Sequence, residues 1–199
     1  MQHQDVVTAR YAARSFTQAR IPEERITELL ELVRWTPSAL NVQPWRFKVV
    51  RDAAAKEALA AAAWGQRHVA ECSHVLVLCA EDDLEGQLRR LEDAYAAAGQ
   101  EAQGQPVLDH AREIFSNLPP AALPSMMRSQ VFIALGTALL AAKSLGLDSC
   151  PVTGFDPAAA AKALGLPARV IPVALCPLGY GTGAPAPRVR VPLSVLLLP

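Results

Sequence analysis

The chain has 199 residues, 51% of them hydrophobic, and its 19 Lys and Arg residues balance 19 Asp and Glu residues. This length and apolar content predict a single globular domain over residues 1–199 with a sizeable core. A net charge of zero excludes a strongly basic field, so neither nucleic acid nor an anionic membrane is expected as a partner.

The cysteines and the apolar segments indicate the compartment. Cys72, Cys79, Cys150 and Cys176 form no C-x-x-C pair, which argues against a metal site or a redox dithiol and fits a reducing cytoplasm. The chain does not start with the charged, apolar and small-residue regions of a signal peptide. The longest uncharged apolar segment, 129–142, is shorter than the roughly 20 residues of a spanning helix. We therefore expect a cytoplasmic protein.

The first predicted element is a short helix over residues 4–10, followed by Arg10 and Arg14 among small residues. If this segment is helical or tightly turned, both guanidinium groups project to one side and one anion could bind both. A second helix is predicted from Pro22, with apolar residues at helical spacing, and it ends at Pro37.

A polar turn is predicted between this helix and the next strand. Pro37 and Pro44 enclose Ser38, Asn41 and Gln43. Because each proline fixes its own φ angle, such a turn can present polar side chains to a planar ligand at a small entropic cost. A helix exit closed by a proline explains the same residues equally well.

A strand over 47–50 and a helix over 53–64 are predicted next. In the break that follows, Gln66 is either a ligand-binding side chain or a solvated loop glutamine. The continuous apolar run 74–79 is typical of a strand covered on both faces.

The middle of the chain combines helices with a loose segment. A helix is predicted over 83–99, and 99–106, rich in Gly and Gln, is expected to be a mobile excursion before a short helix over 108–115. Phe115, if exposed, could cover a flat ligand; the alternative is a core aromatic. The long helix predicted over 125–145 is apolar on nearly all sides, and a subunit interface would bury it.

Near the end, Asp156 and Pro157 predict a helix that ends at Gly165, after a turn whose backbone N–H groups are free. A strand is predicted over 170–178. The glycines of 179–183 are not followed by a helix, which excludes a Rossmann loop. In the tail, alternation with valine places Arg188 and Arg190 on one side of an extended segment.

The order and spacing of these motifs resemble the nitroreductase family of FMN-dependent NAD(P)H oxidoreductases over nearly the whole chain. The motifs are Arg10-x-x-x-Arg14-Ser15-Phe16, Pro37-Ser38-x-x-Asn41-x-Gln43-Pro44-Trp45-x-Phe47, Gly146-Leu147 before Pro151-x-x-Gly154-Phe155, and Leu178-Gly179-Tyr180 before Arg188-x-Arg190-x-Pro192.

The resemblance implies an α+β fold, with a central mostly antiparallel sheet flanked by helices, in an intertwined homodimer that holds FMN in the subunit interface. It implies an enzyme that uses NAD(P)H as co-substrate and reduces nitroaromatics, quinones or related flat small molecules by ping-pong hydride transfer. No side chain need act as nucleophile or obligatory acid, so no catalytic residue is assigned.

The resemblance also assigns roles to single positions. Arg10 and Arg190, with Arg188 beside them, match phosphate ligands, and Arg14 matches a basic residue near the flavin pyrimidine edge. Phe115 matches an aromatic over the open face of the flavin, where substrate binds. The other cofactor-binding positions implied are Tyr11, Ala12, Ser38, Ala39, Asn41, Gln66, Pro151, Val152, Thr153 and Gly154.

Two positions depart from the family pattern, and three alternatives stay open. Ala12 stands where many relatives have serine, and Thr153 stands where a glutamate is common. The first alternative is a flavin-binding module that stores, senses or breaks down FMN without NAD(P)H turnover. The second is a cofactor-free helical dimerisation protein, and the third is a narrow-substrate enal or semialdehyde reductase of the same fold.

Overall fold

The computed structural model describes residues 2–119, 121–183 and 185–198, and in these ranges four strands form one antiparallel sheet. The strand order is β1-β2-β4-β3. The strands are β1 (Trp45–Val50), β2 (His74–Glu81), β3 (Asp148–Ser149) and β4 (Val170–Gly179). The helices are α1 (His3–Ala9), α2 (Glu23–Arg34), the 3-10 helix η1 (Ala39–Asn41), α3 (Ala53–Ala62), α4 (Arg67–Glu71), α5 (Leu84–Ala97), α6 (Glu101–Ser116), α7 (Ala122–Ser144), α8 (Pro157–Leu164) and α9 (Leu193–Leu196).

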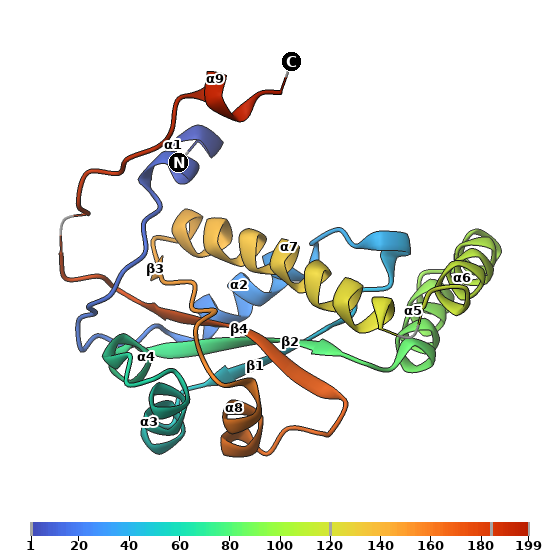
Figure 1. The fold of residues 1–199 in the computed structure, drawn as a ribbon, viewed down its shortest axis with the longest axis horizontal. Helices are drawn as coiled ribbons and strands as arrows, with labels where there is room; N and C mark the ends of the chain where they lie inside the picture. Colours follow the sequence, from blue (N-terminus) through green and yellow to red (C-terminus); the bar gives the residue numbers. More distant parts are fainter. Residues whose placement is uncertain (1, 120, 184, 199) are drawn as a thin grey trace.

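Helices cover both faces of the sheet. The helices α2 and α7 lie on one face, and α3 and α8 lie on the other (Figure 1). Strand β2 separates the two cores, because successive side chains of a strand point to opposite faces. Leu76 and Leu78 pack in the α2–α7 core, whereas Val75 and Val77 pack in the α3–α8 core. The predicted α+β fold and the doubly covered strand are therefore confirmed.

Short polar caps set several helix boundaries. Asp52 caps α3 by accepting a hydrogen bond from the Ala55 N–H at 2.9 Å. Asp156 caps α8 by accepting hydrogen bonds from the N–H groups of Ala158 and Ala159. Pro157 is the first residue of that helix. Gly165 ends α8 in the left-handed conformation with a φ of 59°. The predicted boundaries of this helix are confirmed.

The predicted loose excursion over 99–106 is wrong, because α6 already begins at Glu101 and continues through Pro106. Gly104 lies inside this helix for a packing reason. A Cβ atom at this position would be 2.4 Å from Cγ of Tyr95, so only glycine lets α6 approach the α5 ring this closely. The glycine thus marks a helix contact and not a loop.

The long helix α7 begins three residues before the predicted start, with Pro124 in its first turn, where a missing N–H costs no helical bond. By length and composition it could cross a membrane. Its inner face belongs to the core, since Val131, Ala134 and Ala138 are fully buried. Its outer face leaves Phe132 and Ile133 exposed, so the described chain covers only one side of this apolar helix.

The tail after β4 extends along α1 and ends in α9, which lies beyond α1 and away from the sheet (Figure 1). Leu193, Val195 and Leu196 of this tail are all exposed. Exposed large apolar side chains in a row are unusual on a monomer and typical of a surface that contacts a partner.

Candidate functional site

The two ends of the chain meet beside β3. Residues 10–17 are extended and form isolated bridges from Ala12 to Ser149 and from Phe16 to Gly181. The Thr17 N–H donates to the Tyr180 carbonyl at 2.8 Å, and the Thr182 hydroxyl donates to Ser15 Oγ at 2.7 Å. The N-terminal segment is therefore held against the chain that leaves β4, as Figure 1 shows.

Tyr11 is one anchor of this junction. Its hydroxyl donates to the Gly183 carbonyl at 3.4 Å, and Lys143 Nζ lies 5.5 Å from the centre of its ring. Burial, followed by the nearby Asp148 carboxylate, raises the pKa of Tyr11. Asp148 also accepts from the Gly181 N–H at 3.0 Å, so the ring and the carboxylate fix the tail to β3.

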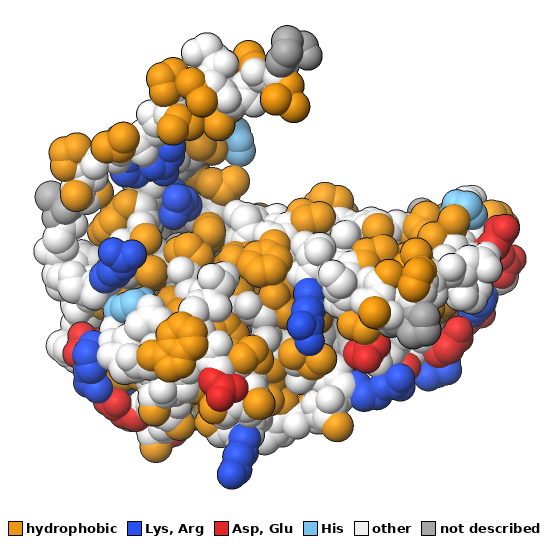
Figure 2. Space-filling view, viewed as in Figure 1, with side chains coloured by type: hydrophobic (Ala, Val, Ile, Leu, Met, Phe, Trp, Pro, Cys, Tyr) orange, Lys and Arg blue, Asp and Glu red, His pale blue; other side chains and the backbone are white. Residues whose placement is uncertain are grey.

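Three arginines from the two ends line one cavity of about 440 Å³, which we call the arginine hollow. Arg10 comes from the end of α1, and Arg188 and Arg190 come from the tail, as their alternation with valine predicts. The Arg188 guanidinium donates to the backbone oxygen of Arg10. Figure 2 shows Lys and Arg side chains gathered where the tail meets α1. The remaining lining residues are Val7, Thr8 and Leu140.

Arg14 does not join Arg10 at this hollow. The expectation that one anion binds both is wrong, because α1 ends at Ala9 and the chain between the two residues is extended. Arg14 lies instead beside Cys150 and His68, where its positive charge acts on the pKa of both groups. Arg10 also acts on the pKa of Cys150, so both charges are felt by the same thiol although only Arg10 lines the hollow.

His68 is a candidate site residue that the sequence did not reveal. Its side chain is only 7% exposed, and its Nε2 atom has no hydrogen-bond partner among the residues that the structure describes. Burial, followed by the positive charge of Arg14, lowers the pKa of His68. A buried polar atom without a partner is costly, which indicates a missing donor or acceptor next to Arg14.

The lowered pKa of His68 predicts a pH dependence of the free energy of unfolding of the ligand-free protein. The unfolded chain takes up a proton near pH 6.5, whereas the folded chain resists it, so stability falls as the pH drops below about 6.5. His68→Gln is expected to flatten this slope in urea unfolding curves measured between about pH 5 and pH 8. The pKa of His74 is also lowered, so part of the slope stays. An unchanged slope in the variant would contradict the assignment.

The loop 151–154 lies next to α4 and offers free backbone donors. Val152 is paired with Leu175 through both of its backbone groups, at 2.8 and 2.9 Å. Among the described residues, the N–H groups of Thr153 and Gly154 make no hydrogen bond. Gln66 Nε2 donates to the Gly154 carbonyl at 2.8 Å, so this side chain positions the loop and is not a solvated loop glutamine.

Trp64 is the second site residue that the sequence missed. It is 73% exposed and has a φ of 55°, a left-handed conformation that is strained for a bulky residue. A Cβ added to Gly154 would be 3.1 Å from its ring, so the indole lies against the loop of free N–H groups. An exposed aromatic plane held in a strained conformation makes Trp64 a candidate for a ligand contact.

The proline-enclosed turn lies at the other end of the molecule, toward α5 and α6 (Figure 1). Its η1 residues Leu40 and Asn41 have positive φ values of 50° and 55°. The Ala39 N–H donates to Gln130 Oε1 of α7 at 2.8 Å, and Ser38 Oγ accepts from the Gln43 N–H at 2.9 Å. One chain therefore does not bring Ser38, Ala39 and Asn41 to the arginine hollow.

Phe115 is a core aromatic, which is the alternative that the sequence left open, so its expected place over a flat ligand is wrong. Phe115 is only 3% exposed, because it follows Leu108 and Ala111 at helical spacing on the buried face of α6. Its ring packs in the α2–α7 core and has no free face for a flat ligand.

Comparison with known proteins decides the family. The family model "Nitroreductase family" matches residues 7–180 of the chain. The chain belongs to the nitroreductase family. It is 38% identical over 197 residues to a protein of Thermus thermophilus named NADH dehydrogenase, with 98% of this chain and 95% of that protein covered. It is 28% identical over 209 residues to the oxygen-insensitive NAD(P)H nitroreductase of Salmonella typhimurium, with 96% of each covered.

The fold of this nitroreductase-family chain also matches solved structures. A structure from Exiguobacterium sibiricum, described as a nitroreductase in complex with FMN, superposes with a TM-score of 0.91 at 26% identity. The match covers 99% of this chain and 96% of that one. The relatives thus span the same length as this nitroreductase-family member.

Proposed function

We propose that the protein, as a single domain over residues 1–199, is an FMN-dependent oxidoreductase that uses NAD(P)H to reduce nitroaromatics, quinones or related flat acceptors. The observation that carries the proposal is the convergence of Arg10, Arg188 and Arg190 from both chain ends on one hollow, in a chain of the nitroreductase family. Bound FMN supplies the hydride chemistry in a ping-pong reaction, and the protein supplies binding, orientation and electrostatics.

The residues fit a flavin phosphate and a flavin ring at separate places. Three guanidinium groups in one hollow suit the charge and the oxygen geometry of a phosphate. Beyond it, Arg14 provides a permanent cation beside His68, whose buried Nε2 has no partner in the described ranges, and this cation would stabilise an anionic reduced ring. The free N–H groups of Thr153 and Gly154 would donate to the edge of the ring.

The site is completed by a second copy of the chain in a homodimer. Ser38, Ala39 and Asn41 lie on a turn that one chain cannot bring to its own hollow, and the resemblance assigns this turn to the flavin of the partner. The exposed outer face of α7, with Phe132 and Ile133, and the exposed apolar tail support this arrangement, because both need a covering surface.

A cytoplasmic location belongs to the same proposal. The four cysteines are free and buried. Burial raises the pKa of Cys72 to about 11 and that of Cys79 to about 12, which makes these thiols unreactive and suits a reducing compartment.

Trp64 replaces Phe115 as the aromatic that covers a flat substrate. Trp64→Ala is expected to raise KM for quinone and nitroaromatic acceptors about 3- to 10-fold, the loss of one aromatic stacking contact, with little change in FMN affinity. Steady-state kinetics with menadione and FMN titration measure the two effects. Trp64→Phe keeps a ring and is expected to retain most of the wild-type KM. An unchanged KM in the alanine variant would remove Trp64 from the substrate site.

The experiment that tests the function is an absorbance spectrum of the FMN-loaded protein. Addition of NADH or NADPH without oxygen should bleach the flavin bands, and menadione or nitrofurazone should then restore them. A yellow protein that neither dinucleotide bleaches would support a flavin-binding module without turnover. A colourless protein that ignores added FMN would support a cofactor-free dimerisation protein.

A further inference from the structure

A cavity of about 510 Å³, which we call the α8 cavity, lies on the α3–α8 face of the sheet, just beyond the end of α8. Cys79 of β2, which packs in the α3–α8 core, lines it. The segment that follows α8 forms an apolar wall with Leu166, Pro167 and Val170. Among the described residues, none that lines the arginine hollow lines this cavity. Its size is that of a small-molecule pocket, which typically measures about 300–1,000 Å³.

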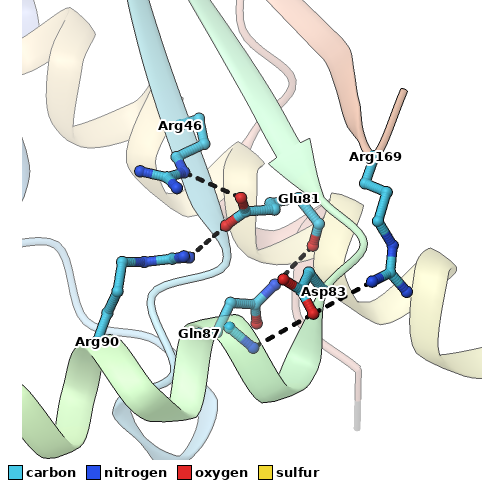
Figure 3. Close-up of polar contacts among 7 residues, drawn as sticks. Arg46, Glu81, Asp83, Gln87, Arg90 and Arg169 are labelled. Carbon is cyan, nitrogen blue, oxygen red and sulfur yellow. Dashed lines mark hydrogen bonds and ion pairs between the residues drawn. The ribbon is translucent and has the colours of Figure 1, made fainter. Parts of the chain in front are cut away.

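The two carboxylates that line the α8 cavity are already paired. Glu81 accepts from Arg46 Nε at 3.1 Å and also from Arg90, which lies outside the cavity (Figure 3). Asp83 accepts from Arg169 Nη1 at 3.2 Å (Figure 3). Both Arg46 and Arg169 line the cavity, and their side chains are 49% and 67% exposed. Their remaining N–H groups are therefore accessible to a ligand, whereas both carboxylates are occupied.

Lys48 is a cation of the α8 cavity that has no carboxylate partner among the residues that the structure describes. It is exposed on β1, and its Nζ donates to the backbone oxygen of Leu164, the last residue of α8, at 3.2 Å. Burial raises the pKa of Cys79 to about 12, and the positive charge of Lys48 offsets part of this rise. The ammonium group thus lies near both Cys79 and the end of α8, with two of its three N–H donors left for a ligand.

We propose that the α8 cavity is a second ligand site, which binds a small organic monoanion with a carboxylate on an apolar body. Lys48 and Arg46 are two residues apart on β1, so they project from the same face and can both donate to the carboxylate. The apolar body would pack against Leu166 and Val170.

The charges and the apolar wall of the cavity select this class of ligand. A neutral molecule would leave the Lys48 charge without a counterion, and the nearby Glu81 and Asp83 carboxylates would repel the second charge of a dianion. A carboxylate without an apolar body would leave the wall exposed to water. A monoanion with an apolar body satisfies all three conditions.

Isothermal titration with cyclohexanecarboxylate in the presence of excess FMN tests this site. Excess FMN fills the arginine hollow, and a saturated ring does not stack as a flat acceptor does. Cyclohexanecarboxylate is expected to bind saturably and about tenfold more tightly than cyclohexanecarboxamide, which lacks the charge, or acetate, which lacks the apolar body.

Four variants locate the bound carboxylate. Lys48→Met removes the ammonium group but keeps most of the stem, and Ala168→Phe fills the cavity from an exposed position on its wall. Both are expected to bind cyclohexanecarboxylate about fivefold or more weakly than the wild type. Lys48→Arg keeps a cation and is expected to retain most of the affinity. Lys162→Met removes a cation of α8 outside the cavity and should bind as the wild type does.

The proposal is overturned if the wild type shows no saturable binding, if the carboxamide binds as tightly as the carboxylate, or if Ala168→Phe binds undiminished. Loss of binding in Trp64→Ala would place the ligand beside the loop 151–154 and would overturn it as well. If Lys48→Met does not fold, Ala168→Phe decides, since thermal unfolding verifies that this exposed position tolerates a larger side chain.

Discussion

Replacing Arg10 and Arg190 together with alanine is expected to weaken FMN binding about 1000-fold and to leave the fold stable. A hydrogen bond to a charged group contributes about 1.5–3 kcal/mol, and each 1.4 kcal/mol is a factor of ten in affinity. Within the described residues, the Arg190 side chain makes one hydrogen bond, to the neighbouring Val189 oxygen at 2.8 Å, so its loss costs the fold little. Titration of FMN fluorescence and thermal unfolding measure the two effects separately.

The matched control replaces Arg25 and Arg34 with alanine. Both are exposed on α2 and pair with Glu28 and Glu31 on the same helix, where a surface ion pair contributes only about 0–1 kcal/mol. This control should bind FMN as the wild type does. Wild-type FMN affinity in the Arg10 and Arg190 double variant would place the phosphate outside the arginine hollow.

Gly179→Ala is expected to lower the free energy of unfolding by about 1–3 kcal/mol and to weaken FMN binding at the same time. The added Cβ would lie 2.6 Å from Cδ1 and 3.1 Å from Cγ of Phe16. The ring must then move, and it belongs to the extended segment that carries Arg10 and Arg14. The clash therefore disturbs the junction of the chain ends as well as the core. Urea unfolding and FMN titration measure both losses.

Gly183→Ala is the control, because a Cβ at this position meets no atom within 4 Å among the described residues. Gly183→Ala is expected to change neither the free energy of unfolding nor the affinity for FMN. A double-mutant cycle with Phe16→Ala adds a sharper test. Removing the ring also removes the clash, so the two losses should combine to less than their sum. Fully additive losses would mean that Phe16 and Gly179 do not contact each other.

Patterns with a strong local cause predicted most of the fold. The apolar run 74–79 became the doubly covered strand β2, and Asp156 with Pro157 marked the start of α8. The prediction of a loose excursion over 99–106 failed because Gly104 and Pro106 are typical loop residues. What overrides them is the contact of Gly104 with Tyr95 of α5, a tertiary fact that no local pattern contains.

In the candidate site, too, local patterns predicted some residues, whereas others depend on tertiary structure. Alternation in the tail placed Arg188 and Arg190 on one side, and both line the hollow with Arg10. The expectation that Arg10 and Arg14 share one anion required a helix or a tight turn, whereas Ala12 between them is paired with Ser149 and the segment is extended. His68 and Trp64 carry no sequence motif. His68 is identified by a buried Nε2 that has no partner among the residues described, and Trp64 by its positive φ. Both properties exist only in the folded chain.

The proposal as a whole depends on guanidinium groups from both ends of the chain holding one flavin phosphate. The most direct measurement compares the dissociation constants of FMN and riboflavin, which differ only in that phosphate, for the wild type and for Arg190→Ala. The wild type should bind FMN at least 100-fold more tightly than riboflavin, and Arg190→Ala should lose at least tenfold of this preference while its affinity for riboflavin stays the same. Equal affinity of the wild type for both flavins, or an undiminished preference in the variant, would contradict the account.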